Sequence, residues 1–336
     1  MTLDDMDIQQ RLVLAFTQSK QPISGEELSH QLGLSRTAVW KHIKQLEALG
    51  FTFEASTRVG YVLRDWPDEL MPALVKPHLA PDRAGALGHL ILWAAEREST
   101  NVTAIQLASE GQPHGTVVTC GVQTGGKGRR DRAWTSPKGG MWFSILLRNP
   151  CALSQAADLT LLASLAVQRA LAKHGVNTRI KWPNDILLNG RKLCGILAQM
   201  RTAGETIDYA VLGIGINANF VEQDLPADLQ GKATTILSAT GKPVYRPRLL
   251  ADILAEIAAL YRLFDEGGGF ADIRDEWLAA CATIGSRVEV QVGREIVAGT
   301  AIDVDDHGNL LMLLDDGTRH RVHSGEILFQ ARDVIP

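Results

Sequence analysis

A glycine-rich stretch at residues 121–140, GVQTGGKGRRDRAWTSPKGG, holds the side chains best suited to bind an anion. Gly121, Gly126 and Lys127 match the phosphate-binding pattern G-x-x-x-x-G-K-[ST], whose glycines lead from a strand into a helix. Position 128 is Gly in place of the Mg²⁺-binding hydroxyl, and proline and glycine interrupt any helix that would follow. The residues therefore argue against a phosphate loop of this type.

The second half of this stretch is strongly cationic. Lys127, Arg129, Arg130 and Arg132 fall within six residues, and Trp134 follows them. Like charges at this density repel one another, so we expect a mobile loop that a bound polyanion orders. Ordering ten residues costs on the order of 10 kcal/mol, which only several charge-assisted hydrogen bonds offset. Trp134 would cover the ligand; the alternative is a solvated basic loop or a second nucleic-acid patch.

The segment KWPND, residues 181–185, ends a strand and turns at Pro183. We expect Asn184 and Asp185 to project from a loop that strands hold on both sides. Such a pair orients either a Mg²⁺–phosphate group or an attacking amine. The alternative is an Asx turn that only joins two strands.

Three other segments place polar or glycine residues beside strands. Lys192 follows a hairpin turn at Asn189 and Gly190, so its charge lies near the inner face of the sheet or extends outward from the strand end. Residues 99–101, Ser-Thr-Asn, separate a strand from a helix and either cap the helix or present polar groups to a small ligand. The glycines of residues 213–217 permit a ligand to approach the backbone closely.

Composition limits the class of protein that carries these residues. The 336 residues are 45% apolar and 21% charged, which predicts buried cores in two or three domains. A net charge of −4 argues against a protein that coats DNA but permits a local basic site. The four cysteines are far apart, so we expect reduced, buried thiols and no zinc site. The chain shows neither an apolar signal core nor a membrane span, which predicts a cytoplasmic protein.

The first 65 residues predict a winged helix. Helical patterns at residues 8–19, 24–33 and 35–50 precede two short strands, FTFEAS and GYVLRD. Ser24 opens a capping box, and Ser35 caps the third helix. This small helix–turn–helix unit with a hairpin is the arrangement that DNA-binding proteins use.

The third helix has an apolar face at Val39, Ile43 and Leu46 and a second face that is polar and cationic. In a major groove, the second face would contact phosphates and base edges. Trp40 is unusual there, and we expect it to be half-buried against the hairpin. The alternative is an ordinary surface helix. The predicted DNA-contacting residues are Arg36, Thr37, Trp40, Lys41 and Lys44, with Arg58 at the hairpin tip.

The rest of the chain divides into three parts. Residues 66–82 contain four prolines and predict a linker or wrapped connection. Residues 83–282 mix strands and helices without strict alternation, which favours an α+β fold with a mixed sheet. Residues 283–336 carry five short strands separated by turns and predict a small SH3-like β-barrel.

Together these motifs resemble the biotin protein ligases. The segments that match are STN (99–101), GGKGRRDRAWTSPKGG (125–140), KWPND (181–185), RKLCGIL (191–197) and GIGIN (213–217), in the order and spacing of that family. The N-terminal unit resembles the winged helix of the bifunctional members, which also repress biotin synthesis genes. The resemblance implies a central domain like that of class II synthetases.

The resemblance also implies a two-step reaction. The carboxylate of biotin attacks the α-phosphate of ATP, which is used with Mg²⁺, and a lysine on a carboxylase carrier domain then attacks the biotinyl-5′-AMP. Arg129, Asp185 and Lys192 are the implied catalytic residues, with Asn184 beside them. The residues implied to contact biotin or the adenylate are Ser99, Thr100, Asn101, Gln123, Lys127, Gly128, Arg129, Arg130, Arg132, Trp134, Asn184 and Lys192; no residue is implied as a resident metal ligand.

The loop departs from the family pattern in two places. The family loop usually reads GRGRRGR, and here it reads GKGRRDR. Lys127 keeps the charge but loses the planar fork of arginine, and Asp131 adds a negative charge and stiffens the backbone. We therefore expect weaker retention of the adenylate than in a GRGRRGR loop.

Three functions remain open from the sequence. The first is a ligase that is also a repressor, in which the adenylate favours a homodimer that binds palindromic operator DNA. The second is a DNA-binding biotin sensor without ligase activity, which the retention of Arg129, Asp185 and Lys192 disfavours. The third is a lipoate-type ligase, which the arginine-rich loop and the spacing of KWPND and RKLCGIL disfavour.

Overall fold

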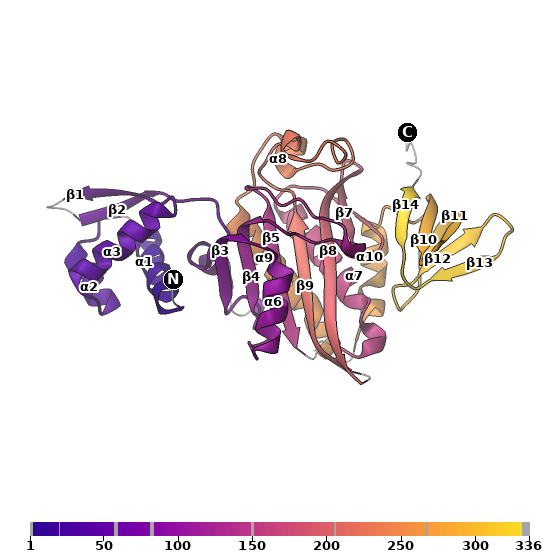
Figure 1. The fold of residues 1–336 in the computed structure, drawn as a ribbon, viewed down its shortest axis with the longest axis horizontal. Helices are drawn as coiled ribbons and strands as arrows, with labels where there is room; N and C mark the ends of the chain where they lie inside the picture. The colour runs from indigo at the N-terminus through magenta and orange to yellow at the C-terminus, as the bar shows by residue number, and fades with distance from the viewer. Residues whose placement is uncertain are drawn as a thin grey trace.

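The computed structural model describes residues 3–19, 21–56, 60–80, 84–148, 151–204, 206–265 and 268–330. Three bodies follow one another along the long axis of the molecule (Figure 1). A small helical unit lies at the N-terminal end, a large sheet with helices lies in the centre, and a β-barrel lies at the C-terminal end.

The N-terminal unit has the predicted winged-helix elements: α1 (Leu3–Gln18), α2 (Gly25–Leu32), α3 (Arg36–Ala48), β1 (Thr52–Ser56) and β2 (Gly60–Asp65). The hydroxyl of Ser24 accepts a hydrogen bond from the backbone N–H of Glu27 at 3.1 Å, as predicted for a helix cap. Ser35 caps α3 in the same way, through the backbone N–H of Ala38 at 3.2 Å. The apolar face of α3 is buried, and β1 pairs with β2 as an antiparallel hairpin.

The connection after β2 packs against both neighbouring units. It contains α4 (Pro72–Val75) and the short 3₁₀ helix η1 (Lys76–His78). Met71 and Leu74 belong to the core of the N-terminal unit, whereas Leu70 and Val75 belong to the core of the central unit. Of the two predicted alternatives, the structure therefore shows a wrapped connection and not a free linker.

Among the described residues, the central unit is a seven-stranded sheet of order β3-β4-β5-β9-β8-β7-β6. Only β3 and β4 are parallel, and every other neighbouring pair is antiparallel, so the predicted mixed α+β sheet is confirmed. The strands are β3 (Ile91–Arg97), β4 (Val117–Gln123), β5 (Met141–Arg148), β6 (Arg179–Lys181), β7 (Asp185–Leu188), β8 (Arg191–Ala203) and β9 (Thr206–Ile216).

The sheet has helices on both faces. Helices α7 (Asp158–Lys173) and α9 (Arg246–Asp265) cover one face, and α6 (Thr100–Ser109) packs on the other. Side chains of β5 alternate between these two faces. Phe143 and Ile145 join the core under α7 and α9, whereas Leu146 joins the core under α6. The face that carries α6 also carries the predicted ligand-binding segments.

Several helices differ from the sequence patterns. The 3₁₀ turn η3 (Leu153–Gln155) precedes α7. The sequence patterns do not predict α8 (Ile236–Thr240) or α10 (Phe270–Ala280). Two further 3₁₀ turns, η2 (Arg129–Asp131) and η4 (Glu222–Asp224), lie in loops.

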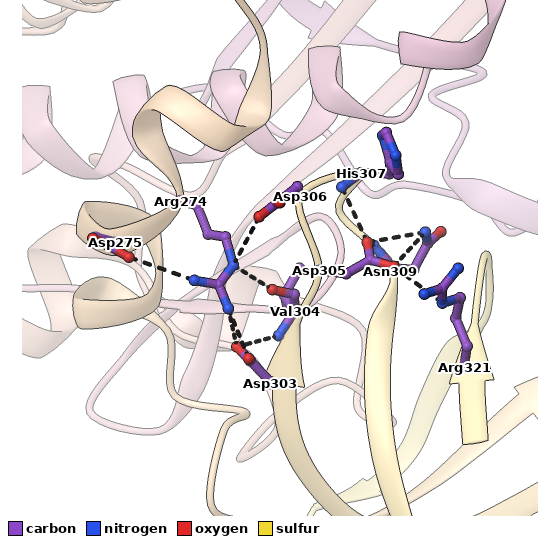
Figure 2. Close-up of polar contacts among 9 residues, drawn as sticks. All are labelled: Arg274, Asp275, Asp303, Val304, Asp305, Asp306, His307, Asn309 and Arg321. Carbon is purple, nitrogen blue, oxygen red and sulfur yellow. Dashed lines mark hydrogen bonds and ion pairs between the residues drawn. The ribbon is translucent and has the colours of Figure 1, made fainter. Parts of the chain in front are cut away.

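The C-terminal unit has the five predicted strands: β10 (Arg287–Val292), β11 (Glu295–Val304), β12 (Leu310–Leu314), β13 (Arg319–Val322) and β14 (Glu326–Gln330). They pair in the order β13-β12-β11-β10-β14, and the predicted SH3-like fold is confirmed. Arg274 of α10 attaches this barrel to the central unit, because it donates to the carbonyl oxygen of Val304 and to both carboxylate oxygens of Asp303 (Figure 2).

In the described part of the chain, no helix is long and apolar enough to cross a membrane. The four cysteines are free thiols: Cys120, Cys194 and Cys281 are buried as predicted, whereas Cys151 is only half-buried. Burial raises the pKa of the Cys120 thiol to about 12. A buried thiol with so high a pKa is a poor nucleophile.

Asp158 is a buried carboxylate between the central unit and the barrel. It is 3% exposed, and a Cβ built on Gly308 of the barrel would lie 3.8 Å from its Oδ1. Asp158 lies in the first turn of α7, where the helix dipole favours the charged form of a carboxylate. Burial is the stronger effect, because it raises the pKa of Asp158 from 3.8 to about 6.

We predict that Asp158→Asn stabilises the protein more at pH 7.5 than at pH 5. The folded state of the wild type binds a proton at Asp158 more tightly than the unfolded state, so the unfavourable contribution of Asp158 grows as pH rises from 3.8 to about 6. The increase in unfolding free energy caused by the substitution should be on the order of 1 kcal/mol larger at pH 7.5 than at pH 5. Thermal denaturation at both pH values measures it, and an equal gain at both would contradict the assignment.

Candidate functional site

A cavity of about 1160 Å³ lies on the α6 side of the sheet, where the glycine-rich loop, the strands β8 and β9, and the barrel meet. The structure brings together at this cavity all but one of the residues predicted to bind the ligand. Those that line it are Ser99, Thr100, Asn101, Gln123, Lys127, Gly128, Arg129, Arg132, Trp134, Asn184, Asp185 and Lys192. The exception is Arg130, which points toward the barrel.

Two lysines and one aspartate form a charged group in the cavity wall. The Nζ of Lys192 lies 2.7 Å from Oδ1 of Asp185, across the β7–β8 hairpin. Lys181, which the sequence analysis did not single out, lines the same wall and donates to the carbonyl oxygen of Ile327 at 3.2 Å. Burial lowers the pKa of Lys181, because little water remains to solvate its charge.

Arg129 is held in place by neutral acceptors. It donates to Oδ1 of Asn184 at 3.0 Å and to the carbonyl oxygen of Gly325 at 2.9 Å. The other end of Asn184 donates to the carbonyl oxygen of Ile196 at 2.8 Å. Both polar atoms of Asn184 are therefore bonded within the protein, which favours a role in orienting Arg129 over direct contact with a phosphate.

The other two arginines of the loop reach the barrel. Arg130 has a φ of 56° and donates to the side chain and the carbonyl oxygen of Gln291. Arg132 forms an ion pair with Glu326, and Arg130 lies 3.5 Å from the same carboxylate. The predicted mutual repulsion is thus offset by partners on the barrel. The side chain of Asp131 lies outside the described residues.

Trp134 lines the cavity and packs against glycines of β8 and β9. A Cβ built on Gly215 would lie 2.6 Å from its Nε1, and one built on Gly195 would lie 2.8 Å from its ring. Lys192 sits over the ring, with its Nζ 5.2 Å from the centroid. The two glycines are therefore required by the indole, and the role of Trp134 as a cover for the ligand stays a prediction.

Polar side chains from α6, β4 and β5 lie together at the inner end of the cavity. The backbone N–H of Thr100 donates to Oε1 of Gln123 at 2.8 Å, and Ser144 on β5 contacts both Thr100 and Asn101. Ser99 occupies the N-cap position of α6, but its side chain makes no capping hydrogen bond, contrary to that prediction. Gln123 takes its place as the acceptor for the helix terminus.

The sequence motifs do not predict Ser144, Gln199, Lys181, Gly195 or the individual role of the strand glycines. Strand alternation could have identified Gly213 and Gly215, because they alternate with the buried Ile214 and Ile216 and so share the opposite face of the sheet. No sequence spacing reveals Gln291 and Glu326, which lie 161 and 194 residues from the arginines they contact.

The predicted DNA-contacting residues of α3 lie on one exposed face. Arg36, Thr37, Lys41 and Lys44 are exposed, and Arg36 and Lys44 form ion pairs with Glu26 and Glu47 respectively. Trp40 is 52% exposed, so its side chain is about half-buried as expected, and its contact with the hairpin stays a prediction. Arg58 lies outside the described residues.

No group of three or more His, Cys, Asp or Glu side chains that could hold a metal ion occurs in the parts of the chain that the structure describes. The two carboxylates that line the cavity are those of Asp185 and Glu326, and Glu326 is paired with Arg132. Asp185 fits a Mg²⁺ ion that arrives with the phosphates of ATP better than a metal that the protein holds alone.

Family models match three parts of the chain. The model described as "Biotin/lipoate A/B protein ligase family" matches residues 94–217, which include most of the cavity wall. A model described as "HTH domain" matches residues 9–62, and one described as "Biotin protein ligase C terminal domain" matches residues 283–330.

The chain is also similar to named proteins over most of its length. It is 36% identical over 307 residues to "Bifunctional ligase/repressor BirA" of Bacillus subtilis (strain 168), which covers 91% of this chain and 93% of the relative. The protein of the same name from Escherichia coli (strain K12) is 30% identical over 312 residues, or 92% of this chain and 94% of the relative.

Among solved structures, "Biotin protein ligase from Aquifex aeolicus in complex with biotin and ATP" aligns with a TM-score of 0.62 and 28% identity, over 71% of this chain and 97% of that one. The fold and the cavity therefore define a protein ligase with an N-terminal helix–turn–helix unit. The chain belongs to the biotin protein ligase family, in the form that carries an N-terminal helix–turn–helix unit, as the sequence motifs predict.

We predict that Gly213→Ala destabilises the protein by about 1–3 kcal/mol, because a Cβ at this position would lie 2.0 Å from Oδ1 of Asn101. Gly25→Ala is a suitable control, since its Cβ would meet only a ring carbon of Tyr61 at an ordinary 3.7 Å. Denaturant unfolding of both variants gives the comparison. Equal stabilities would show that Asn101 moves aside freely.

Proposed function

We propose that this protein is an ATP-dependent biotin protein ligase that forms biotinyl-5′-AMP and transfers biotin to a lysine of a carboxylase carrier domain. The observation that carries the proposal is the charged wall of the cavity, where Arg129, Lys181 and Lys192 converge beside Asp185. An acyl-adenylation needs such cations, because its two substrates are both anions.

In the first step, a carboxylate oxygen of biotin attacks the α-phosphorus of ATP. The bond from phosphorus to the β-phosphate bridging oxygen breaks, and pyrophosphate leaves with the electron pair. Lys192 and Arg129 neutralise the carboxylate and the phosphate as they approach, and they stabilise the negative charge that develops on the phosphate oxygens. Mg²⁺ bound to the phosphates of ATP supplies further charge neutralisation.

In the second step, the neutral amine of the carrier lysine attacks the acyl carbon of the adenylate. The bond from that carbon to the phosphate oxygen breaks, AMP leaves with the electron pair, and the nitrogen loses one proton to solvent. Asp185 fits the role of orienting this amine, because its carboxylate lies at the cavity wall and is already paired with one ammonium group, that of Lys192. Asn184 acts through Arg129, to which its Oδ1 is bonded.

The inner polar end of the cavity is the proposed biotin site, and the arginine loop is the proposed adenylate site. Trp134 lies between the two proposed sites, because its indole packs on Gly215 and lies beneath Lys192. The residues proposed for biotin are Ser99, Thr100, Asn101, Gln123, Lys127, Gly128, Arg129 and Lys192; those for the adenylate are Arg129, Arg130, Arg132 and Trp134.

The N-terminal unit extends the proposal to transcription. The cationic face of α3 suits operator DNA near biotin synthesis genes, and an adenylate-bound homodimer would place two such helices on a palindrome. The proposed domain limits are residues 1–65 for DNA binding, 66–82 for the connection, 83–282 for catalysis and 283–336 for the barrel.

Pyrophosphate release tests the ligase. We expect release that requires both biotin and ATP, and we expect Lys192→Met to lower its rate by about 10²–10³-fold through loss of charge stabilisation. Lys242→Met, an exposed position outside the cavity, should retain the wild-type rate. Release with lipoate and not with biotin would favour a lipoate ligase, and biotin binding without any release would favour a sensor.

Electrophoretic mobility shifts on biotin-gene promoter DNA test the repressor. Binding should strengthen with biotin plus ATP, and the double variant Lys41→Ala, Lys44→Ala should weaken it. If each lysine contacts one phosphate, the double variant removes four contacts per homodimer, so the slope of log affinity against log salt should decrease in magnitude by about 4. No binding in either ligand state, or an unchanged slope, would contradict the role of this helix face.

A further inference from the structure

Lysine side chains at the cavity differ in whether the protein holds their amines. The lysines that line it are Lys127, Lys181, Lys192 and Lys232. Lys192 pairs with Asp185, and Lys181 donates to the carbonyl oxygen of Ile327. Lys127 and Lys232 are exposed, and their side chains form no hydrogen bond or ion pair with any other residue that the structure describes. Two primary amines are therefore available at a cavity that is proposed to hold an activated acyl group.

The backbone of Lys127 is held beside the inner polar end of the cavity. It pairs with Ala133 in an isolated antiparallel bridge, and the N–H of the following Trp134 donates to the carbonyl oxygen of Gly126 at 2.9 Å. Gly126 lies against Gln123, because a Cβ built on this glycine would be 3.0 Å from Nε2 of Gln123. The side chain of Lys127 therefore starts close both to the proposed biotin site and to Trp134.

This position brings the amine of Lys127 near the reactive bond of the adenylate. In the proposed function, biotin lies at the inner polar end and AMP lies along the arginine loop, so the acyl carbon between them lies near Trp134. The flexible four-carbon stem of lysine lets Nζ approach that carbon. Arginine in the same place would not react, because its guanidinium stays protonated.

We propose that Lys127 is a site of self-biotinylation, at which the protein transfers the biotinyl group of its own adenylate to itself when no carrier domain is bound. The inference rests on the proposed function, which supplies the biotinyl-5′-AMP. The neutral amine of Lys127 attacks the acyl carbon, and the bond from that carbon to the phosphate oxygen breaks. AMP leaves with the electron pair, the nitrogen loses one proton to solvent, and an amide remains.

The modification limits the activity of the protein when carrier is scarce. An amide at Lys127 removes one cation from the loop, as acylation of any lysine does. It also leaves a biotinyl group tethered beside the site for free biotin, where its effective concentration far exceeds that of a ligand in solution. We therefore expect pyrophosphate release to fall in proportion to the fraction of molecules that are modified.

Peptide mapping by mass spectrometry, after incubation with biotin and ATP but no carrier domain, tests the proposal. The wild type should gain one biotinyl group on Lys127. The exposed Lys242, which lies outside the cavity, should gain about tenfold less or none, because only Lys127 is held beside the acyl group. Dilution of the protein should leave the labelled fraction at a given time unchanged, since the transfer occurs within one molecule, and excess carrier domain should lower it.

Two arginine substitutions separate the two unpaired lysines. Lys127→Arg keeps a cation but should lose the label, because arginine is not a nucleophile. Lys232→Arg is the matched control at the other exposed lysine of the cavity, and it should keep the label on Lys127. Biotinyl-5′-AMP is also added directly in place of biotin and ATP, so that a change in the rate of adenylation in either variant does not hide the result.

An unlabelled Lys127 in wild-type protein that releases pyrophosphate would overturn the proposal. So would a label on Lys181, Lys192 or Lys232 in its place, or a labelled fraction that falls with dilution. Failure of the proposed function is a separate result, because the wild type would then release no pyrophosphate from biotin and ATP. In that case, labelling of Lys127 by added biotinyl-5′-AMP would support this inference, and its absence would overturn it.

Discussion

The constraint that governs this structure is the need to bring two anions together in one partly dry cavity. A carboxylate and a phosphate at 4 Å repel each other by about 4 kcal/mol at an effective dielectric constant near 20. Cations offset this repulsion, but they must be held in position before the substrates arrive. Arg129 is held by the neutral acceptors Asn184 and Gly325, and Lys192 is held by Asp185 and Trp134. Gly195 of β8 and Gly215 of β9 contribute to this arrangement, because they leave space for the indole of Trp134, over which Lys192 lies.

The barrel is part of this arrangement and not an appendage. Residues 326–328 line the cavity, and Glu326 and Gln291 contact the arginines of the loop. At the other end of the molecule, the connection after β2 places side chains in two cores at once, so the helix–turn–helix unit packs directly on the central sheet. Both ends of the chain are thus attached to the unit that contains the cavity.

Local patterns predict most of this fold, because caps, turns and strand alternation are properties of neighbouring residues. Ser24, Ser35 and the Asn189–Gly190 turn behave as their sequence predicts. Ser99 was expected to cap its helix, but Gln123, which is remote in sequence, supplies the acceptor for the helix terminus. The motifs identified the cavity wall, whereas its supporting residues, such as Gln199 and Glu326, become visible only when the chain is folded.

The account depends most on one claim, that the cations of the cavity serve an acyl transfer which ends on a carrier lysine. Intact-mass spectrometry of a carboxylase carrier domain, incubated with the protein, ATP and biotin, tests it directly. The account predicts the addition of one biotinyl group to one lysine, and no addition when ATP is omitted or lipoate replaces biotin. An unmodified carrier domain, or addition of lipoate in place of biotin, would contradict it.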